Sequence, residues 1–391
     1  MRPLEVDIHA AMIAAYVHIP FCSAICPYCD FAVVAGADDR IERYVDAVIT
    51  EIGLSDPWRE LDAVYFGGGT PSHVHPHLLG RVLDSLRTRH GIAPDAEISL
   101  EANPEDFGEQ RAVELLSAGF TRVSFGAQSF DDGVLASLGR RHRAEDIDRS
   151  VDNARRAGFD NVSLDLIFGT PVETGDSWAL SLQRAVDLQP DHVSCYALTV
   201  EPGTPLHREV KAGAEAPDPD IQADRYELAG TILPLAGLDR YEVSNWSRPG
   251  RQCRYNLVVW AQGEYEAYGN GAHRFLGRVR SHNVRRLEAY MDRVEAGTRP
   301  IAGVDPIEGW DVEIDRLFVG LRRSVGVGPG PGVESLIQTS GGQVLLREGI
   351  IEVADGRLVV RRPLLTDEVH RQVLDLAPPR GWVESINTDN L

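Results

Sequence analysis

Apolar stretches rich in β-branched residues recur through the first two thirds of the chain. Each precedes a longer segment whose apolar residues recur at helical spacing. The predicted strands lie at 14–20, 61–68, 97–104, 122–129, 161–169, 192–200 and 240–247. Amphipathic segments such as 39–54, 75–91 and 143–159 predict helices between them, and several end near a glycine that suits a helix C-cap.

This alternation, at about 25–48 residues per unit, predicts parallel strands joined by right-handed crossovers. Most of these strands are almost entirely apolar, as expected where both faces of a sheet are covered. Cys22, Gly67, Glu101, Gln128 and Asp165 lie at the carboxyl ends of strands, the edge that carries active sites in α/β barrels. The pattern favours an α/β partial barrel, and a doubly wound open sheet is the alternative.

The rhythm changes after residue 247. Residues 311–323 predict a helix, 326–332 a loop, Asp355–Gly356 a hairpin turn and 366–376 a last helix. With a short helix before the hairpin, these elements predict a small winged-helix-like α+β domain. The expected organisation is an N-terminal extension (1–13), the barrel (14–247), an Arg- and aromatic-rich linking segment (248–304), the winged-helix-like domain (305–378) and a tail (379–391).

Composition excludes several classes of protein. No apolar run approaches the roughly 20 residues that span a bilayer, and the first residues lack the features of a secretory signal, so we expect a cytoplasmic protein. The formal net charge of −20 disfavours a general nucleic-acid binder. Five cysteines in 391 residues are too few for a disulfide scaffold.

Three of these cysteines form a compact motif. Cys22, Cys26 and Cys29 follow the first predicted strand with the spacing C-x3-C-x2-C, and thiolates select zinc, copper(I) or iron–sulfur clusters. Structural zinc and ordinary iron–sulfur clusters take four ligands, so three would leave one iron open to a small molecule. Alternatively, the cysteines could share one face of a helix, but Pro27 argues against a regular helix.

The motif resembles that of the radical S-adenosylmethionine (radical SAM) superfamily, and further segments extend the resemblance over residues 14–275. The subgroup concerned contains the oxygen-independent coproporphyrinogen III oxidases (HemN) and the HemW haem chaperones. The matching segments are YVHIPFCSAICPYCDF (16–31), YFGGGTPS (65–72), SLEANPED (99–106), SFGAQSF (124–130), LGRRH (138–142) and DLIFGTP (165–171).

The resemblance implies a 4Fe–4S cluster on Cys22, Cys26 and Cys29. SAM would be chelated by the open iron and cleaved by one electron to methionine and a 5′-deoxyadenosyl radical. The implied SAM site comprises Tyr16, Tyr28, Gly68, Gly69, Thr70, Glu101, Gln128, Arg140, Asp165 and Ala197. The glycines admit close backbone contact, and the carboxylates can accept hydrogen bonds from ribose hydroxyls or the ammonium group. Taken singly, these residues also suit a tight turn, a solvated carboxylate or a core aromatic.

Two features favour the HemW branch. Cys29 is followed by Asp30 and Phe31, whereas HemN-like oxidases carry a fourth cysteine shortly after the third. Those oxidases also have a long extension before the motif, and here 21 residues precede Cys22.

Residues 248–286 carry positive charge inside an acidic chain. Eight arginines against Glu264 and Glu266 give 8 − 2 = +6, beside several aromatic residues. Such a segment suits a flat anionic ligand such as haem, and a solvated basic loop paired with the acidic body is the alternative.

The segment CRYNLVVW (253–260) resembles the HemW haem-binding signature, with Tyr255 where the family usually has His. The haem-binding candidates are therefore Tyr255, Asn256, Trp260 and His273. We favour His273 over Tyr255 as the iron ligand, because neutral imidazole needs no activation.

The resemblance implies a haem chaperone that binds a 4Fe–4S cluster, SAM and haem, receives electrons from a donor, and delivers haem to membrane-bound haem proteins. The alternatives are an oxygen-independent coproporphyrinogen III oxidase of porphyrin biosynthesis, or an iron–sulfur protein that does not cleave SAM. Whether the protein is an enzyme is therefore left open by the sequence.

Overall fold

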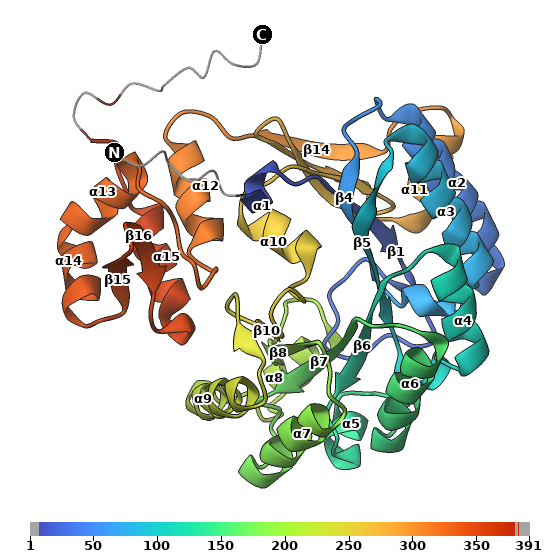
Figure 1. Ribbon diagram of the computed structural model, residues 1–391, viewed down its shortest axis with the longest axis horizontal. Helices are drawn as coiled ribbons and strands as arrows, with labels where there is room; N and C mark the ends of the chain where they lie inside the picture. The colour runs from blue at the N-terminus through green and yellow to red at the C-terminus, as the bar shows by residue number, and fades with distance from the viewer. Residues whose placement is uncertain (1–7, 380–381, 383–391) are drawn as a thin grey trace.

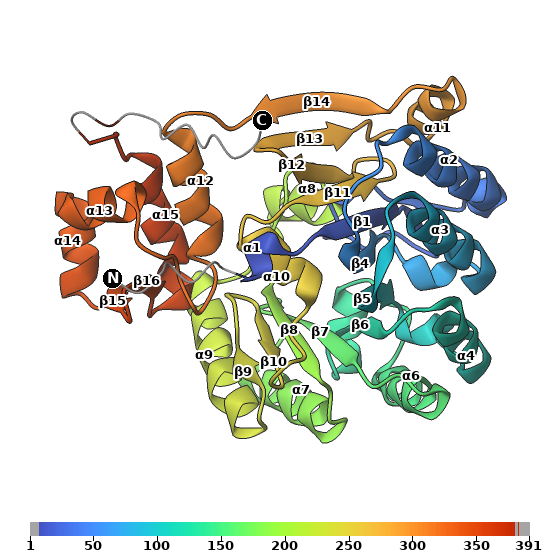
Figure 2. The same ribbon diagram turned by 45° about the horizontal axis from the view of Figure 1, so that its top comes forward.

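The computed structural model describes residues 8–379 and 382. Its largest element is a curved 12-stranded sheet in the order β14-β13-β12-β11-β1-β4-β5-β6-β7-β8-β10-β9, seen from two directions in Figures 1 and 2. The six central strands run parallel: β1 (Ala14–Ile19), β4 (Leu61–Gly68), β5 (Ile92–Ala102), β6 (Arg122–Gln128), β7 (Val162–Phe168) and β8 (His192–Ala197). The predicted partial barrel is confirmed.

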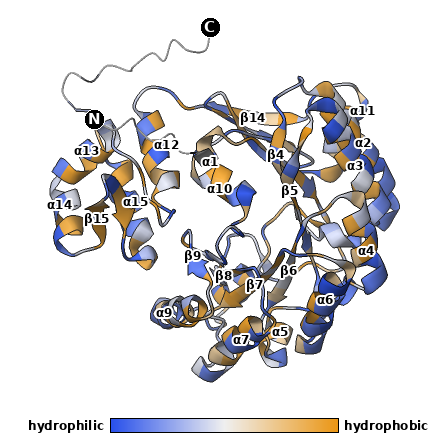
Figure 3. Cartoon of the chain, in the orientation of Figure 1, coloured by the Kyte–Doolittle hydropathy of each residue, from blue (hydrophilic) through white to orange (hydrophobic). Residues whose placement is uncertain are grey.

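Helices follow the parallel strands and cover the convex face of the sheet (Figure 1). They are α2 (Ile41–Leu54), α3 (Pro76–Arg89), α4 (Glu109–Ala118), α6 (Ala144–Ala157), α7 (Gly175–Asp187) and α9 (Pro219–Leu235). As predicted, glycines in the left-handed conformation end α4 (Gly119, φ 105°) and α6 (Gly158, φ 112°). Hydrophobic residues concentrate along the strands and polar ones on the outer helix faces (Figure 3).

The segment expected to link the domains instead extends the sheet. After β9 (Asp239–Arg240) and β10 (Asn245–Ser247), the short helix α10 (Arg254–Trp260) packs against β1 and β4. The chain then returns to the first strand, where β11 (Tyr265–Tyr268) pairs parallel with β1. The antiparallel strands β12 (His273–Leu276), β13 (Val279–Asn283) and β14 (Ile301–Pro306) continue from it, with α11 (Leu287–Glu295) before β14.

A buried polar network fastens these added strands to α2. The fully buried carboxylate of Glu51 accepts hydrogen bonds from Gly269 N (2.9 Å), the Tyr290 hydroxyl (2.7 Å) and Asn283 Nδ2 (2.7 Å). Arg274 lies 3.4 Å from the same carboxylate. All four neighbours are donors, which matches an ionised carboxylate, although burial raises the pKa of Glu51.

The C-terminal unit has its own apolar core. It comprises α12 (Asp311–Gly320), α13 (Pro331–Gln338), α14 (Ser340–Arg347), the hairpin β15 (Ile351–Ala354) and β16 (Arg357–Val360), and α15 (Thr366–Leu374). Two helices therefore stand where we predicted one before the hairpin. The predicted turn is present, with positive φ at Asp355 (50°) and Gly356 (76°).

Among the described helices, none combines the length and the apolar character needed to cross a membrane. Residues 1–7 of the predicted N-terminal extension and nearly all of the predicted tail lie outside the described residues.

Candidate cluster and cofactor site

The three motif cysteines open into one cavity of about 440 Å³. Cys22 ends the short strand β2 (Phe21–Cys22), and the loop from Cys22 to β3 (Val34–Ala35) carries Cys26 and Cys29, joined by a turn in which Cys29 N donates to Cys26 O (3.1 Å). Cys195 and Cys253 are buried in the core and do not line this cavity.

The surroundings of the thiols suit a metal cluster. The Thr70 hydroxyl donates to Cys22 Sγ (3.6 Å) and Arg140 Nη1 to Cys26 Sγ (3.5 Å), and both contacts stabilise thiolates. Burial raises the pKa of Cys22 to about 11, and a bound cation would favour its thiolate form. Within the described residues, no three His, Cys, Asp or Glu side chains converge on a single ion. A cluster is compatible with this spacing, because each cysteine binds a different iron.

The glycine-rich turn after β4 forms another wall of the cavity. Gly68 has a φ of +114°, and a Cβ there would lie 2.3 Å from the imidazole of His18. A Cβ on Gly69 would lie 2.7 Å from the carbonyl carbon of Pro20. Only glycine fits either position, so this turn packs directly against the strand that leads to Cys22.

Two half-buried carboxylates line this cavity from strands β5 and β7, which flank β6: Glu101 and Asp165. Glu101 accepts hydrogen bonds from the Tyr65 hydroxyl (2.9 Å) and Gly68 N (3.1 Å). Asp165 accepts from Ser124 Oγ (3.0 Å) and Ser194 Oγ (2.7 Å). Burial, and then the negative charge of Asp165, raise the pKa of Glu101 to about 7, and burial also raises the pKa of Asp165. A ligand that supplies positive charge or further hydrogen-bond donors would therefore stabilise the ionised form of both carboxylates.

Arg140 joins the cysteine loop to the strand ends. Its Nη2 donates to Asn103 Oδ1 (2.6 Å) and to Gly126 O (3.2 Å), while Asn103 Nδ2 donates to Thr70 Oγ1 (3.2 Å). The strand β6 ends at Gln128 in a left-handed conformation (φ 63°), which is strained for a residue with a side chain.

Most of the predicted SAM-binding residues meet in this cavity. Those that line it are Tyr28, Gly68, Gly69, Thr70, Glu101, Gln128, Arg140, Asp165 and Ala197. Tyr16 lies instead in a neighbouring cavity. Sequence reasoning missed Tyr65, Asn103 and Tyr196, which also line the first cavity, although Tyr65 and Asn103 lie inside motifs that pointed to it.

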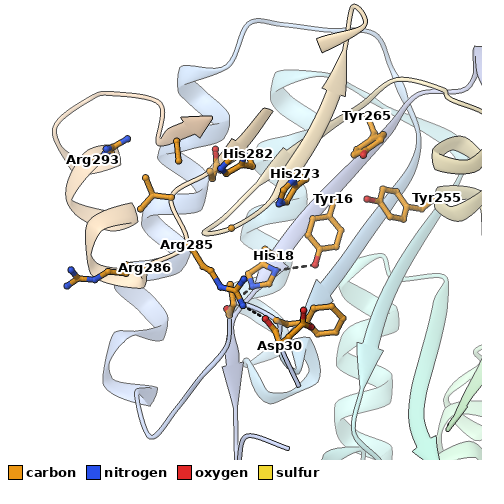
Figure 4. Close-up of a pocket in the computed structure, with 16 residues that line it drawn as sticks. Tyr16, His18, Asp30, Tyr255, Tyr265, His273, His282, Arg285, Arg286 and Arg293 are labelled. Carbon is orange, nitrogen blue, oxygen red and sulfur yellow. Dashed lines mark hydrogen bonds between the residues drawn. The ribbon is translucent and has the colours of Figure 1, made fainter. Parts of the chain in front are cut away.

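The second cavity, of about 880 Å³, lies between the cysteine loop and the added strands (Figure 4). Asp30 and Phe31 line both cavities, so the cysteine loop is a shared wall. His18 Nε2 lies 3.0 Å from the Ala32 carbonyl, which can only accept, so Nε2 carries the proton and Nδ1 accepts from the Tyr16 hydroxyl (3.1 Å). Burial lowers the pKa of His18 to about 4, consistent with this neutral form.

Only two of the haem-binding candidates, Tyr255 and His273, line the second cavity. The ring of Trp260 lies under the guanidinium of Arg322, 4.8 Å from Cζ to the ring centroid, and neither Trp260 nor Asn256 is among the residues that line this cavity. Arg285 and Arg286, from the predicted Arg-rich segment, also line this cavity, together with His282 and Arg293, which sequence reasoning did not single out.

The curved sheet, with three cysteines and a glycine-rich turn around one cavity at its strand ends, defines a radical SAM protein. Residues 16–185 match the model of the Radical SAM superfamily, and membership implies a 4Fe–4S cluster and SAM. The fold is shared with the solved coproporphyrinogen III oxidase HemN of Escherichia coli, with a TM-score of 0.80 and 21% identity over 94% of this chain and 92% of that one.

Sequence comparison is more specific. The chain is 39% identical over 373 residues to the protein named "Heme chaperone HemW" in Mycobacterium tuberculosis, covering 92% of this chain and 94% of the relative. It is 33% identical to the protein of the same name in Bacillus subtilis, covering 81% and 85%. The chain therefore belongs to the HemW family.

Proposed function

We propose that this protein is a haem chaperone that holds a 4Fe–4S cluster and SAM in the first cavity and binds haem in the second. The observation that carries the proposal is the second cavity itself. At about 880 Å³ it has the size of sites for cofactor-sized molecules, roughly 300–1,000 Å³. Its lining combines tyrosines, histidines and arginines, which suit a flat aromatic ring, a metal and carboxylates respectively.

The first cavity supplies the cofactor part of the proposal. Cys22, Cys26 and Cys29 would hold the cluster, while Arg140 and Glu101 would orient SAM beside it. When bound, the cluster supplies one-electron chemistry, for which the protein would need an electron donor. The shared wall at Asp30 and Phe31 would place haem next to this chemistry without mixing the two sites.

The haem would then pass to membrane-bound haem proteins, with the chaperone working in the cytoplasm. The relatives named haem chaperones support this role, since they match over most of both chains. The fold alone also suits an oxidase, because HemN shares it.

Anaerobic experiments test the proposal. The protein, with its cluster reconstituted, is titrated with haem and then mixed with nanodiscs that contain a haem-depleted membrane cytochrome. We expect saturable one-to-one haem binding and transfer to the cytochrome. A parallel incubation with coproporphyrinogen III, SAM and a reductant should leave the substrate unchanged. Formation of protoporphyrinogen IX, or the absence of stoichiometric haem binding, would overturn the chaperone assignment.

A further inference from the structure

Two histidines on neighbouring strands lie side by side and line the second cavity. His273 on β12 is the direct antiparallel partner of His282 on β13, and their rings stack with centroids 5.1 Å apart and an interplanar angle of 23°. Within the part of the chain that the structure describes, neither imidazole has a hydrogen-bond partner. The pair therefore offers ring nitrogens that no neighbouring group occupies.

The neighbouring strand makes room for this pair. Gly303 on β14 is the register partner of His282, and a Cβ at this position would lie 2.3 Å from His282 Cε1. Any larger residue at 303 would displace the His282 ring and with it the stacked His273. The glycine thus fixes His282 between β14 and His273, which lies on the side of the tyrosines in Figure 4.

Positive charge lines the same cavity. Arg285 reaches toward His18 and donates to the Asp30 carbonyl, while Arg286 and Arg293 lie further out at the start of and within α11 (Figure 4). Within the described residues, neither Arg285 nor Arg286 has a carboxylate in ion-pair distance. Three arginines against Asp30 give the lining 3 − 1 = +2, in a chain of net charge −20.

We infer that His273 binds the haem iron, that His282 is a positioning residue that holds the His273 ring, and that Arg285, Arg286 and Arg293 bind the haem propionates. This inference rests on the proposed haem-binding function and assigns its ligands. Two nearly parallel imidazoles on one side of a cavity cannot bind opposite faces of one haem, so only one of them reaches the iron. His273 is that ligand, because it lies between His282 and the tyrosines that can stack on the porphyrin.

The local chemistry favours imidazole over phenolate. Burial lowers the pKa of His273, with the nearby His282 and arginines acting in the same direction, so the ring is neutral and able to bind iron. Burial raises the pKa of Tyr255 well above its usual value, which opposes the phenolate that iron coordination would need. Arg285, Arg286 and Arg293 are exposed, so carboxylates bound to them would keep part of their hydration.

Ring substitutions separate a ligand from a positioning role. In His273→Phe the stacking ring remains but the nitrogen donor is lost, so the ferric haem spectrum should lose its histidine-ligated signature and affinity should fall roughly tenfold or more. His282→Phe should keep that signature with nearly normal affinity. His273→Ala should regain the signature when imidazole is added to the buffer. His77→Phe is the control, since the His77 ring packs edge-on against another histidine, His75, with centroids 4.9 Å apart, and lies outside the second cavity.

The propionate contacts are tested with haem and its dimethyl ester. Wild type should prefer the diacid, and Arg286→Gln/Arg293→Gln should lose most of this preference, whereas Arg149→Gln on the exposed face of α6 should not. Cluster absorbance and SAM binding check that each variant is folded, because they report on the other cavity.

Each outcome decides the inference. A wild-type spectrum in His273→Phe, a lost signature in His282→Phe, or equal affinity of wild type for diacid and ester would overturn it, while leaving the chaperone function in place. Failure of the wild type to bind haem stoichiometrically would instead reject the proposed function.

Discussion

Replacing Glu51 by Gln should loosen the strands that bear the second cavity while sparing the cysteine loop. The carboxylate is fully buried on α2, and its four donor neighbours come from the segment between Gly269 and Tyr290. This one side chain therefore joins the first crossover helix to β11–β13, strands that lie far along the chain from it.

The magnitude follows from the donor count. In the wild type both carboxylate oxygens of Glu51 accept hydrogen bonds. Glutamine has one carbonyl oxygen, so its NH2 group, itself a donor, would face donors that now bond to the second oxygen. The cheapest orientation keeps the oxygen toward Asn283 and Arg274, and turns the amide toward Tyr290, whose hydroxyl can rotate to accept. Gly269 N is then left unpaired, which costs about 1–3 kcal/mol. Glu51→Ala leaves Arg274 with less countercharge and should cost about 3–5 kcal/mol.

Urea unfolding gives the free energy of unfolding, and haem titration reports on the second cavity. We expect Glu51→Gln to lower the urea midpoint and haem affinity together, with cluster content unchanged. Glu295→Gln is the control. Glu295 is an exposed carboxylate on α11 that pairs with Arg43 on α2, so its replacement should change neither the urea midpoint nor haem affinity. If the Glu51→Gln variant is as stable as wild type, or loses the cluster but keeps haem, the reasoning is refuted.

The remaining predictions concern the first cavity. Serine in place of Cys22, Cys26 or Cys29 should abolish the brown chromophore after anaerobic reconstitution, whereas Cys195→Ser and Cys253→Ser should keep it; the reverse result would contradict the ligand assignment. Asp165→Ala should weaken SAM binding about tenfold with iron content intact, since this carboxylate lies on β7 and is hydrogen-bonded to Ser124 and Ser194 rather than to a motif cysteine; isothermal titration and iron analysis check this, and loss of iron would show a structural role instead. Because the pKa of Glu101 is raised to about 7, the SAM-free protein keeps a proton that the unfolded chain releases near 4.5. The stabilisation this group contributes is complete below about 4.5 and is lost as pH rises through 7, so Glu101→Gln should flatten the pH profile of the unfolding midpoint, and an unchanged profile would reject the shift.

The parallel strands could be predicted from sequence because both of their faces are covered. Strand β4 matches its predicted range, 61–68, and β6 and β7 differ from theirs by no more than one residue at either end. The first cavity followed from the same signal, because parallel strands bring their carboxyl ends, and the motifs on them, to one edge of the sheet. Tyr16 was predicted to join the SAM site and lines the second cavity in the structure; the sequence does not show that β11 returns to pair with β1.

The added strands were missed because their inward faces are not apolar. Glu266 and Arg274 are both buried and pair at 3.0 Å, so β11 and β12 lack the alternating apolar pattern that predicts a half-buried strand. Without the register of these strands, the cross-strand pairing of His273 with His282 cannot be predicted, although the two residues lie only nine positions apart.

The Arg-rich segment illustrates how far charge alone can predict a site. Its +6 charge was open to two interpretations, a haem-binding surface or a loop paired with the acidic body. In the structure, some of its arginines fit the first interpretation and others fit the second. Arg251 pairs with Asp160 (3.2 Å) and Arg280 with Asp315 (2.5 Å), as expected for a loop paired with the acidic body. Arg285 and Arg286, at the end of the same segment, are among the residues that line the second cavity. The charge of the segment therefore does not predict which arginines bind a ligand. That depends on where strands β11–β14 place each arginine, because an arginine is available to an anionic ligand only where the fold leaves it without an acidic partner.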